Sequence, residues 1–373
     1  MADINDLKNI PPEPPSGWRP GVEFDGTEGY ITTHPTEQVN HEDVARILEA
    51  SRLNPDDFIV DWTSATRVTS HIGADGQLVQ AWYKLGFHRK PDRTFDVEDL
   101  LDDIYDIEDP PRQPDIGWRT ILITDQHIGK SAAAGGGTET IIQRWKMGVE
   151  QALKDKVYEG VNLVLGGDTI EGYVSQGGKN IVDCDLILSE QIRTAQHMVS
   201  WTIQRLLESA GQVIVSAVPG NHSETTRVQN MPLGDNFDVM ILKNVEQAFQ
   251  LAGTDRVRFI YPDATQGSVT YEAGDATFCV VHGHKFKSQM KGAQDWWSGH
   301  IANDREPSEA TILLAGHFHN FQAQAWTSRR WIIFGPSLET ESTWYSASTG
   351  ATSRPGVLTF VTVDGEPKEM EIC

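Results

Sequence analysis

The chain has 373 residues, enough for one large α/β domain plus a smaller one, and its 39% hydrophobic and 23% charged composition is typical of a globular protein. Its formal net charge of −22 argues against general electrostatic binding of nucleic acid, which needs clustered lysine and arginine. It does not exclude a nucleic-acid substrate held locally, because a site with two divalent metal ions is positive whatever the average surface charge.

The apolar residues and the cysteines indicate where the protein works. No apolar run approaches the ~20 residues needed to cross a bilayer, so we expect no membrane partner. The acidic N-terminus lacks the basic start and apolar core of a signal peptide. The cysteines Cys184, Cys279 and Cys373 show no metal or redox spacing. These features predict a reduced, cytoplasmic protein and leave its oligomeric state open.

Two segments of unusual composition divide the chain. Residues 1–20 are rich in proline and predict a flexible lead-in. Residues 96–116 are dense in aspartate and glutamate among leucines and isoleucines, a pattern that allows a short acidic helix before the prolines that follow. We therefore expect a small N-terminal domain over 21–95, an acidic, proline-containing linker, and a larger domain over 117–373.

The small domain has an α+β pattern. A short helix is predicted over 41–52, with Asn40 as its cap. Strands are predicted over 58–70 and 77–87, and the Gly-Ala-Asp-Gly sequence at 73–76 indicates that they form a hairpin.

Basic residues gather near the end of the second of these strands: Lys84, His88, Arg89, Lys90 and Arg93. Beside Trp62, Trp82 and Tyr83 they could contact a nucleic-acid strand. The alternative, which we favour, is a solvated hairpin end with the aromatic side chains in a small core. A protein partner, such as an ATPase, would bind through this domain.

The larger domain alternates short apolar strands with amphipathic helices, which predicts layered α/β packing with a mixed sheet. Strands are expected over 119–124, 161–165, 212–218, 257–261, 268–272, 277–282, 311–315, 330–334 and 357–363. Helices are expected over 139–156, 185–209 and 235–251.

Polar clusters follow five of these strands. They are Asp125-Gln-His127, Gly167-Asp168, Gly220-Asn221-His222, His282-Gly-His284 and Gly316-His317-Phe-His319. Residues i and i+2 of an extended chain point to the same side, so Asp125 and His127 can converge on one ion. The glycines before Asp168, Asn221 and His317 allow tight turns and close backbone approach. Carboxylate, amide and imidazole ligands suit Mn²⁺, Fe, Ni²⁺ or Zn²⁺, and sheet ends commonly gather binding loops.

These five motifs, in this order, resemble the calcineurin-like metallophosphoesterase family. Its pattern is Asp-x-His, Gly-Asp-x-x-(Asp/Asn), Gly-Asn-His-(Asp/Glu), a lone His, and Gly-His-x-His. The resemblance covers about residues 117–365. It implies a four-layer αββα sandwich and a phosphoesterase with two divalent metal ions as cofactors.

The resemblance also implies roles for individual residues. Asp125, His127 and His319 would bind one metal ion. Asn221, His282 and His317 would bind the second, and Asp168 would bridge the two. His222 would lie near the metals without ligating them, and would act as general acid or stabilise charge on the departing oxygen.

Three positions depart from the family pattern. Glu171 stands where the family usually has Asp or Asn, a position that is generally not a ligand. Ser223 follows His222, so the customary acid is displaced to Glu224. His282 and His284 compete for the lone-histidine position, and we select His282 because it directly ends a predicted strand.

The substrate is suggested by less specific sequence similarities. Thr-Asp-Gln-His-Ile-Gly-Lys at 124–130 is similar to the opening motif of SbcD-like DNA-repair exonucleases. The segment from Gly220 to Arg227 and the later Trp344-Tyr resemble phage-encoded phosphoesterases of that type. A manganese-dependent DNA exonuclease or phosphodiesterase is therefore our first hypothesis. The alternatives are a phosphodiesterase or phosphatase for small nucleotides, including cyclic ones, and a metal-stabilised protein that binds a partner without catalysis.

Two further polar or aromatic stretches have structural interpretations. Trp296 and Trp297 could border the substrate cleft and stack on a base, but packed core tryptophans are favoured. Asp183, Cys184 and Asp185 precede a predicted helix, and helix capping explains them without chemistry.

Overall fold

A computed structural model describes residues 15–16, 18–72, 78–90, 116–154, 156–228, 232–340, 350 and 353–373. The chain divides into two compact units, Met1–Asp92 and Arg93–Cys373. The predicted boundaries after residues 20, 95 and 116 stay predictions. The turn at 73–76, the acidic helix, Arg93 and Trp344 lie outside the described residues.

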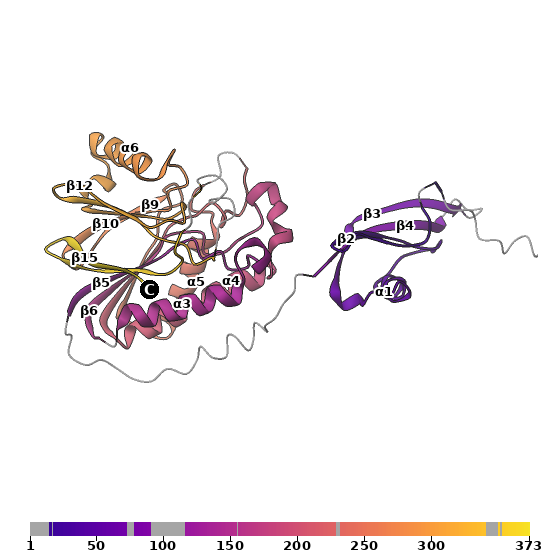
Figure 1. Cartoon of the computed structure of the whole chain (residues 1–373), viewed down its shortest axis with the longest axis horizontal. Coiled ribbons are helices and arrows are strands. Elements are labelled where there is room, and N and C mark those ends of the chain that lie inside the picture. The colour runs from indigo at the N-terminus through magenta and orange to yellow at the C-terminus, as the bar shows by residue number, and fades with distance from the viewer. Residues whose placement is uncertain are drawn as a thin grey trace, which may run out of the picture. The chain divides into compact units, whose positions relative to one another are not determined.

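The first unit is a four-stranded antiparallel sheet with one α-helix (Figure 1). Its strands, in the order β1-β2-β4-β3, are β1 (Gly21–Phe24), β2 (Glu28–Thr32), β3 (Phe58–Ile72) and β4 (Leu78–Arg89). Helix α1 (His41–Ala50) begins where the sequence predicts, because Asn40 and Asp43 exchange side-chain to backbone hydrogen bonds at its N-terminus. Strands β1 and β2 and the 3₁₀ turn η2 (Pro55–Asp57) were not predicted.

Aromatic side chains form the core of this unit. Phe24 and Phe58 each lie within 5.4 Å of Phe87, centroid to centroid, and Trp82 is buried. Two of the basic side chains lie over rings: the Lys84 ammonium is 4.9 Å from the Tyr30 ring, and the Arg89 guanidinium is 5.4 Å from the Phe58 ring. Of the three aromatic residues that the sequence places near this hairpin end, Trp82 is buried and Trp62 packs against the core, as predicted, whereas Tyr83 is half-buried.

The second unit contains a six-stranded and a five-stranded sheet. The six-stranded sheet has the order β15-β14-β5-β6-β7-β8, with bounds β5 (Ile116–Ile123), β6 (Tyr158–Leu165), β7 (Ala210–Ala217), β8 (Val257–Ile260), β14 (Leu358–Val363) and β15 (Glu366–Ile372). The five-stranded sheet has the order β12-β13-β11-β10-β9, with bounds β9 (Ser268–Ala273), β10 (Ala276–Val281), β11 (Ile312–Ala315), β12 (Gln322–Thr327) and β13 (Arg330–Phe334).

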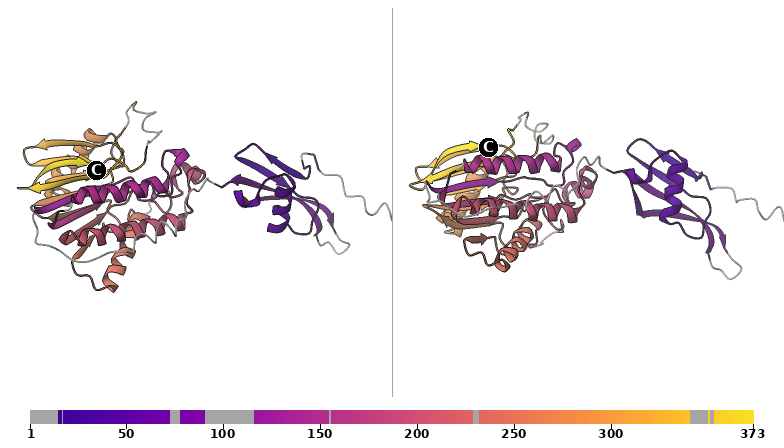
Figure 2. Two further views of the ribbon diagram at one scale, coloured as in Figure 1. Left: turned by 60° about the horizontal axis from the view of Figure 1, so that its bottom comes forward. Right: turned by 90° about the horizontal axis from the view of Figure 1, so that it is seen from below.

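Helices cover the outer faces of the two sheets, as Figures 1 and 2 show. They are α3 (Thr138–Leu153), α4 (Leu188–Leu207), α5 (Phe237–Leu251) and α6 (Gln289–Ala302), with 3₁₀ turns η3 (Ala132–Ala134), η4 (Ser175–Asp183) and η5 (Glu306–Glu309). Successive residues of β5 point to opposite faces: Ile121 and Ile123 pack under α3 and α4, whereas Leu122 packs between the sheets against residues such as Phe278.

The mixed α/β class predicted from the sequence is confirmed, and the predicted strands and helices of this unit are present with shifted ends. Helix α6 and strands β12 and β15 were not predicted. The described residues include no helix long and apolar enough to cross a membrane.

Parallel pairing places the functional loops. Strands β5, β6, β7 and β8 run parallel to one another, and so do β10, β11 and β13. The loops that follow parallel strands lie at one edge of the sheet, which is where α/β proteins commonly bind ligands.

Trp297 offers a test of the packing between α6 and the five-stranded sheet. Its side chain is fully buried and its Nε1 donates a hydrogen bond to the Pro307 carbonyl at 2.6 Å. We expect Trp297→Ala to lower the free energy of unfolding by about 3–5 kcal/mol, the usual cost of removing a buried tryptophan. Denaturant unfolding followed by circular dichroism measures it. Trp296→Ala, at a half-buried neighbour, is the control, and equal effects of the two substitutions would contradict this packing.

Candidate metal centre

Loops after five strands bring the predicted site residues together. Asp125 and His127 follow β5, Asp168 follows β6, and Asn221 follows β7. His282 directly follows β10, whereas His317 and His319 follow β11. Their side chains form two neighbouring groups of nitrogen and oxygen atoms.

Asp125, His127 and His319 form the first group, with one potential ligand atom from each lying within 4.8 Å of the others. The Nε2 atoms of His127 and His319 are 3.2 Å apart, and His319 Nε2 is 3.3 Å from Asp125 Oδ1. Each ring turns its Nδ1 to a carboxylate, so each Nε2 is free to present a lone pair to a shared cation.

Asp168, His282 and His317 form the second group. His282 Nε2 lies 3.0 Å from Asp168 Oδ2 and 3.2 Å from Asn221 Oδ1. Its Nδ1 is 2.8 Å from the Gly166 carbonyl, which fixes the proton on that nitrogen and leaves Nε2 for a metal. The same Nε2 is 4.0 Å from Asp125 Oδ1, so the two groups adjoin.

His284 lies beside this group, with its ring centroid 5.5 Å from that of His282. It belongs to none of the three groups of converging ligand atoms found among the described residues, the third being His127, Glu171 and His222. Burial and the neighbouring cations lower the pKa of His284 to about 3. This geometry favours His282 as the lone-histidine ligand, an assignment that stays a prediction.

The backbone of the ligand loops is held in an uncommon conformation. Five predicted ligands have positive φ: Asp125 (53°), His127 (51°), Asp168 (55°), His317 (71°) and His319 (54°). Residues other than glycine rarely adopt this left-handed region, and such residues cluster at functional sites. The loops therefore adopt an unfavourable backbone conformation, which directs these side chains toward one place.

Two glycines of the motifs are required because side chains of other loops approach them closely. A Cβ at Gly220 would lie 2.1 Å from Asp168 Oδ1, and a Cβ at Gly316 would lie 2.5 Å from Asp125 Oδ2. Both distances are shorter than any real contact, so a side chain at either position would displace a predicted ligand.

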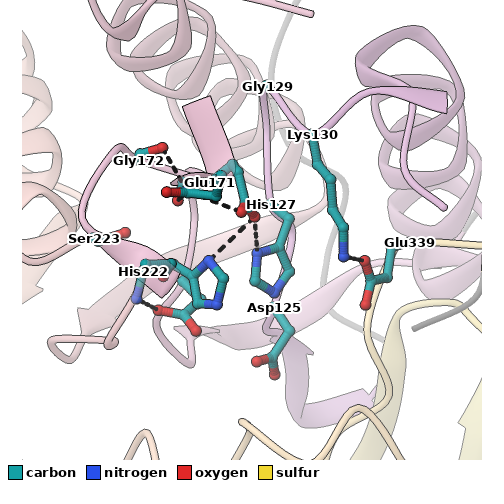
Figure 3. A network of polar contacts seen from close by, with 12 residues as sticks. Asp125, His127, Gly129, Lys130, Glu171, Gly172, His222, Ser223 and Glu339 are labelled. Atoms are coloured by element: carbon teal, nitrogen blue, oxygen red, sulfur yellow. Dashed lines mark hydrogen bonds and ion pairs between the residues drawn. The ribbon is translucent and has the colours of Figure 1, made fainter. Parts of the chain in front are cut away.

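Glu171 orients two histidines, a role that its sequence position did not suggest. Its Oε2 lies 2.9 Å from His127 Nδ1 and 3.1 Å from His222 Nδ1, so it stands between the two rings (Figure 3). Asn180 donates a hydrogen bond to its Oε1 at 3.1 Å. Glu171, at a position of the family pattern that is generally not a ligand, thus contacts a predicted ligand and the predicted general acid.

Glu339 performs the corresponding task for His319. It follows β13, is buried, and has Oε1 2.5 Å from His319 Nδ1. Lys130 reaches from the loop after β5 to the other oxygen of the same carboxylate (Figure 3). A carboxylate on the second nitrogen of a metal-ligating histidine fixes the ring and raises its basicity.

Asp238, at the start of α5, ties two ligand loops together. Its Oδ2 accepts hydrogen bonds from the backbone N–H groups of Asp168 (3.1 Å) and Gly220 (2.9 Å). Its Oδ1 accepts from the Thr169 N–H and the Ser223 hydroxyl, both at 2.9 Å. Ser223, which departs from the family pattern, therefore supports the loop through Asp238.

Glu224, the displaced acid of that motif, forms an ion pair with Arg227 at 3.1 Å. It contacts neither group of predicted ligands through any interaction recorded for the described residues. Ser223, and not Glu224, is the residue after His222 that hydrogen-bonds to Asp238.

Opposing effects set the pKa values of the carboxylates. Burial alone would raise the pKa of Asp168, but the imidazoles of His282 and His222 outweigh it and hold the value well below the usual range. Burial likewise opposes the ionised form of Asp125, and His319 and His282 nonetheless keep its pKa low. Both groups are therefore anionic at neutral pH and able to bind a cation.

The pKa values of the histidines are set by the same interactions with the carboxylates. Burial lowers the pKa of His282, but Asp168 and Asp125 raise it to about 9. Asp125 and Glu339 likewise overcome burial and raise the pKa of His319 to about 10. Burial and the charge on His282 lower the pKa of His317 to about 4. Protons and metal ions would compete for the first two rings.

These observations fit two divalent cations. The donors are carboxylate and amide oxygens and imidazole nitrogens, which suit Mn²⁺, Fe, Ni²⁺ or Zn²⁺. The ligand roles of Asp125, His127, Asp168, Asn221, His282, His317 and His319 stay predictions that this geometry favours.

Two secondary expectations need correction. Asp185 does cap a helix, but the helix is α3, because its carboxylate accepts from the Thr138 N–H and hydroxyl at 2.9 and 2.6 Å. The following helix, α4, begins instead after Ile187. Of the two adjacent tryptophans, Trp297 is in the core as expected, whereas Trp296 lines a cleft.

Asp238→Asn tests the tie between the ligand loops. An amide offers one acceptor oxygen and turns an NH₂ group toward two donors, leaving buried N–H groups unpaired. We expect a loss of about 2 kcal/mol or more in unfolding free energy and a tenfold or greater loss of Mn²⁺ affinity, measured by denaturation and calorimetry. Asp255→Asn, at an exposed aspartate, is the control. Unchanged stability and affinity would refute the role of Asp238.

The raised histidine pKa values predict that metal binding depends on pH. Because His282 and His319 have pKa values of about 9 and about 10, both must release a proton to bind a metal at neutral pH. Mn²⁺ affinity should therefore keep rising between about pH 6.5 and 8.5, whereas ordinary imidazoles, with a pKa of about 6.5, would level off near pH 7.5. Calorimetry in buffers of different ionisation enthalpy measures the protons released. Constant affinity over this range, with no proton release, would contradict the prediction.

No protein-family model matches the sequence, and no curated protein matches it. Solved structures with partial similarity include Vps29 from Entamoeba histolytica complexed with Zn²⁺ (10% identity, covering 67% of this chain and 88% of that one, TM-score 0.31). Others are a predicted phosphoesterase from Streptococcus pneumoniae (14%, 65% and 83%, 0.27) and Vps29 from Chaetomium thermophilum (8%, 66% and 82%, 0.32). TM-scores this low carry no argument about function, so the family resemblance rests on the sequence motifs.

Proposed function

We propose that this chain is a phosphoesterase that binds two divalent metal ions and hydrolyses phosphodiester bonds, with DNA as its first candidate substrate. One observation carries the proposal: two groups of potential metal ligands lie next to each other. Each group has nitrogen and oxygen donors, and its residues lie on loops that follow β5, β6, β10 and β11. Two packed sheets with helices on their outer faces are also the arrangement that the metallophosphoesterase resemblance implies.

Each of the two groups of residues would bind one metal ion. Asp125, His127 and His319 would hold one ion, and Asn221, His282 and His317 the other. Asp168, whose Oδ2 faces His282, would contact both. Two such ions, when bound, supply a water with a lowered pKa and neutralise the charge that develops on phosphoryl oxygens.

His222 is suited to protonate the departing oxygen. Its backbone N–H donates to Asp168 Oδ1 at 2.7 Å, which fixes the residue beside the ligands. Burial lowers the pKa of His222, but Asp168 and Glu171 outweigh burial and raise it. The raised pKa favours the protonated imidazole, which is the form that a general acid requires. Glu171 Oε2 lies 3.1 Å from His222 Nδ1, so the other ring nitrogen, Nε2, is the one available to a substrate.

Substitutions at two positions separate metal binding from proton donation. His222→Ala should lower kcat by about 10²–10⁴-fold, the usual contribution of a positioned acid, while both metal ions remain bound. Asp168→Asn should lower metal content and turnover together, because it removes the carboxylate that we assign to both ions. Metal analysis and initial rates measure both. A His222→Ala protein with normal kcat would remove the role assigned to this histidine.

The substrate class is tested by an activity matrix. The purified chain is assayed with Mn²⁺, Fe²⁺, Ni²⁺ and Zn²⁺ against linear single-stranded and double-stranded DNA, plasmid and cyclic nucleotides. Release of nucleotides from DNA ends, lost in Asp168→Asn, supports the proposal. Hydrolysis of cyclic nucleotides alone would replace DNA by a small-nucleotide substrate. No hydrolysis of any substrate with both ions bound would contradict the proposal and favour a binding protein.

A further inference from the structure

A cleft of about 1220 Å³ adjoins the second ligand group. Asn221 and His317 line it at one end, and its walls continue to Trp296 on α6 and to Arg305 beyond that helix. Small-molecule sites occupy about 300–1,000 Å³, so this cleft has room for more than one nucleotide.

Trp296 stands on the wall of this cleft, although its neighbour Trp297 is fully buried in the core. Its ring centroid lies 5.7 Å from that of Phe286 and 4.1 Å from that of His300, and both residues also line the cleft. A half-buried aromatic ring held between other rings is a rigid surface on which a nucleobase can stack.

Two cationic side chains of the cleft lining are available to a ligand. Lys285 and Arg305 line the cleft, are exposed, and form no ion pair with a carboxylate of any described residue. Arg227, a third cation of the lining, is already paired with Glu224. Phosphate groups are suitable ligands for both side chains.

Two more carboxylates line the cleft and limit how strongly it attracts anions. Glu306 accepts a hydrogen bond from the Thr270 N–H at 3.2 Å, and Asp235 is exposed on the other side near Asn236. The protein part of the cleft is therefore close to neutral. Stacking, rather than a broad positive field, has to supply much of the affinity.

We propose that this wall binds a single-stranded nucleic-acid segment leading to the metal centre, with a base stacked on Trp296 and phosphates contacted by Lys285 and Arg305. The inference rests on the proposed function for the reaction at the end of the cleft. A single strand can turn the face of a base to the indole, whereas the bases of a duplex are stacked on one another.

The test measures binding without hydrolysis. Fluorescently labelled (dT)8 and (U)8 are titrated with the full chain in EDTA, and anisotropy gives Kd. We expect Trp296→Ala to weaken binding by about 5- to 150-fold, as for other stacked bases, and Trp296→Phe to retain most of it. Lys285→Ala and Arg305→Ala should each reduce the slope of log K against log salt by about 0.7.

Lys291→Ala is the matched control, because Lys291 lies on the same helix as Trp296 but pairs with Asp295 and is 71% exposed at its side chain. It should leave binding unchanged. Thermal unfolding of each variant confirms that the fold is intact. If Trp296→Ala unfolds, the salt slopes of Lys285→Ala and Arg305→Ala carry the test, and slopes equal to that of the wild type would contradict the inference.

Three results would overturn the inference. They are equal binding by wild type, Trp296→Ala and Trp296→Phe, a mononucleotide that binds as tightly as the octamers, and a preference for duplex over single strand. Because binding is measured without metal, its outcome is separate from that of catalysis. Strand binding through Trp296 without hydrolysis would refute the proposed function alone, and hydrolysis that does not depend on Trp296 would refute this inference alone.

Discussion

Five carboxylates lie buried around one place in the larger unit, and the rest of the site depends on how their charge is balanced. Asp125, Asp168, Glu171, Asp238 and Glu339 are each at most 3% exposed. An unpaired buried charge costs several kcal/mol, so each of these groups needs cations or hydrogen-bond donors. Imidazoles, backbone N–H groups and the Lys130 ammonium supply them. Two divalent cations would balance the same charge more completely, which is why we read this cluster as a metal centre.

The carboxylates also explain the form of the loops. Asp238 accepts from the loops after β6 and β7 at once, and the Asp125 carboxylate accepts from the His317 N–H at 2.8 Å, which joins the loops after β5 and β11. Such bridges stabilise backbone that would otherwise be unfavourable, since both Asp125 and His317 have positive φ. The unfavourable backbone conformation of the loops is therefore stabilised by hydrogen bonds to the buried carboxylates.

The sequence predicted the strands that carry the site because their apolar residues alternate with clear polar and glycine turns. It missed α6, whose segment contains Gly292 and Gly299 and whose first residue follows Ser288 without a side-chain cap. It also missed the edge strands β12 and β15, which are largely polar and, as edge strands, pair on one side only. Such edge strands have little of the alternating apolar pattern from which a strand is predicted.

The ligand positions could be proposed from motifs, whereas their supports could not. Glu339 follows β13, and Asp238 stands in the first turn of α5 where an acid ordinarily favours the helix dipole. Neither position is close in sequence to the residue that it supports. Only the pairing of distant strands brings them together, so a sequence pattern carries no signal for them.

The central claim is that two cations lie on either side of Asp168, and anomalous diffraction from crystals grown with Mn²⁺ tests it most directly. The account predicts two peaks, one among Asp125, His127 and His319 and one among Asn221, His282 and His317, with Asp168 in contact with both. A single peak, or metal bound away from these side chains, would contradict it.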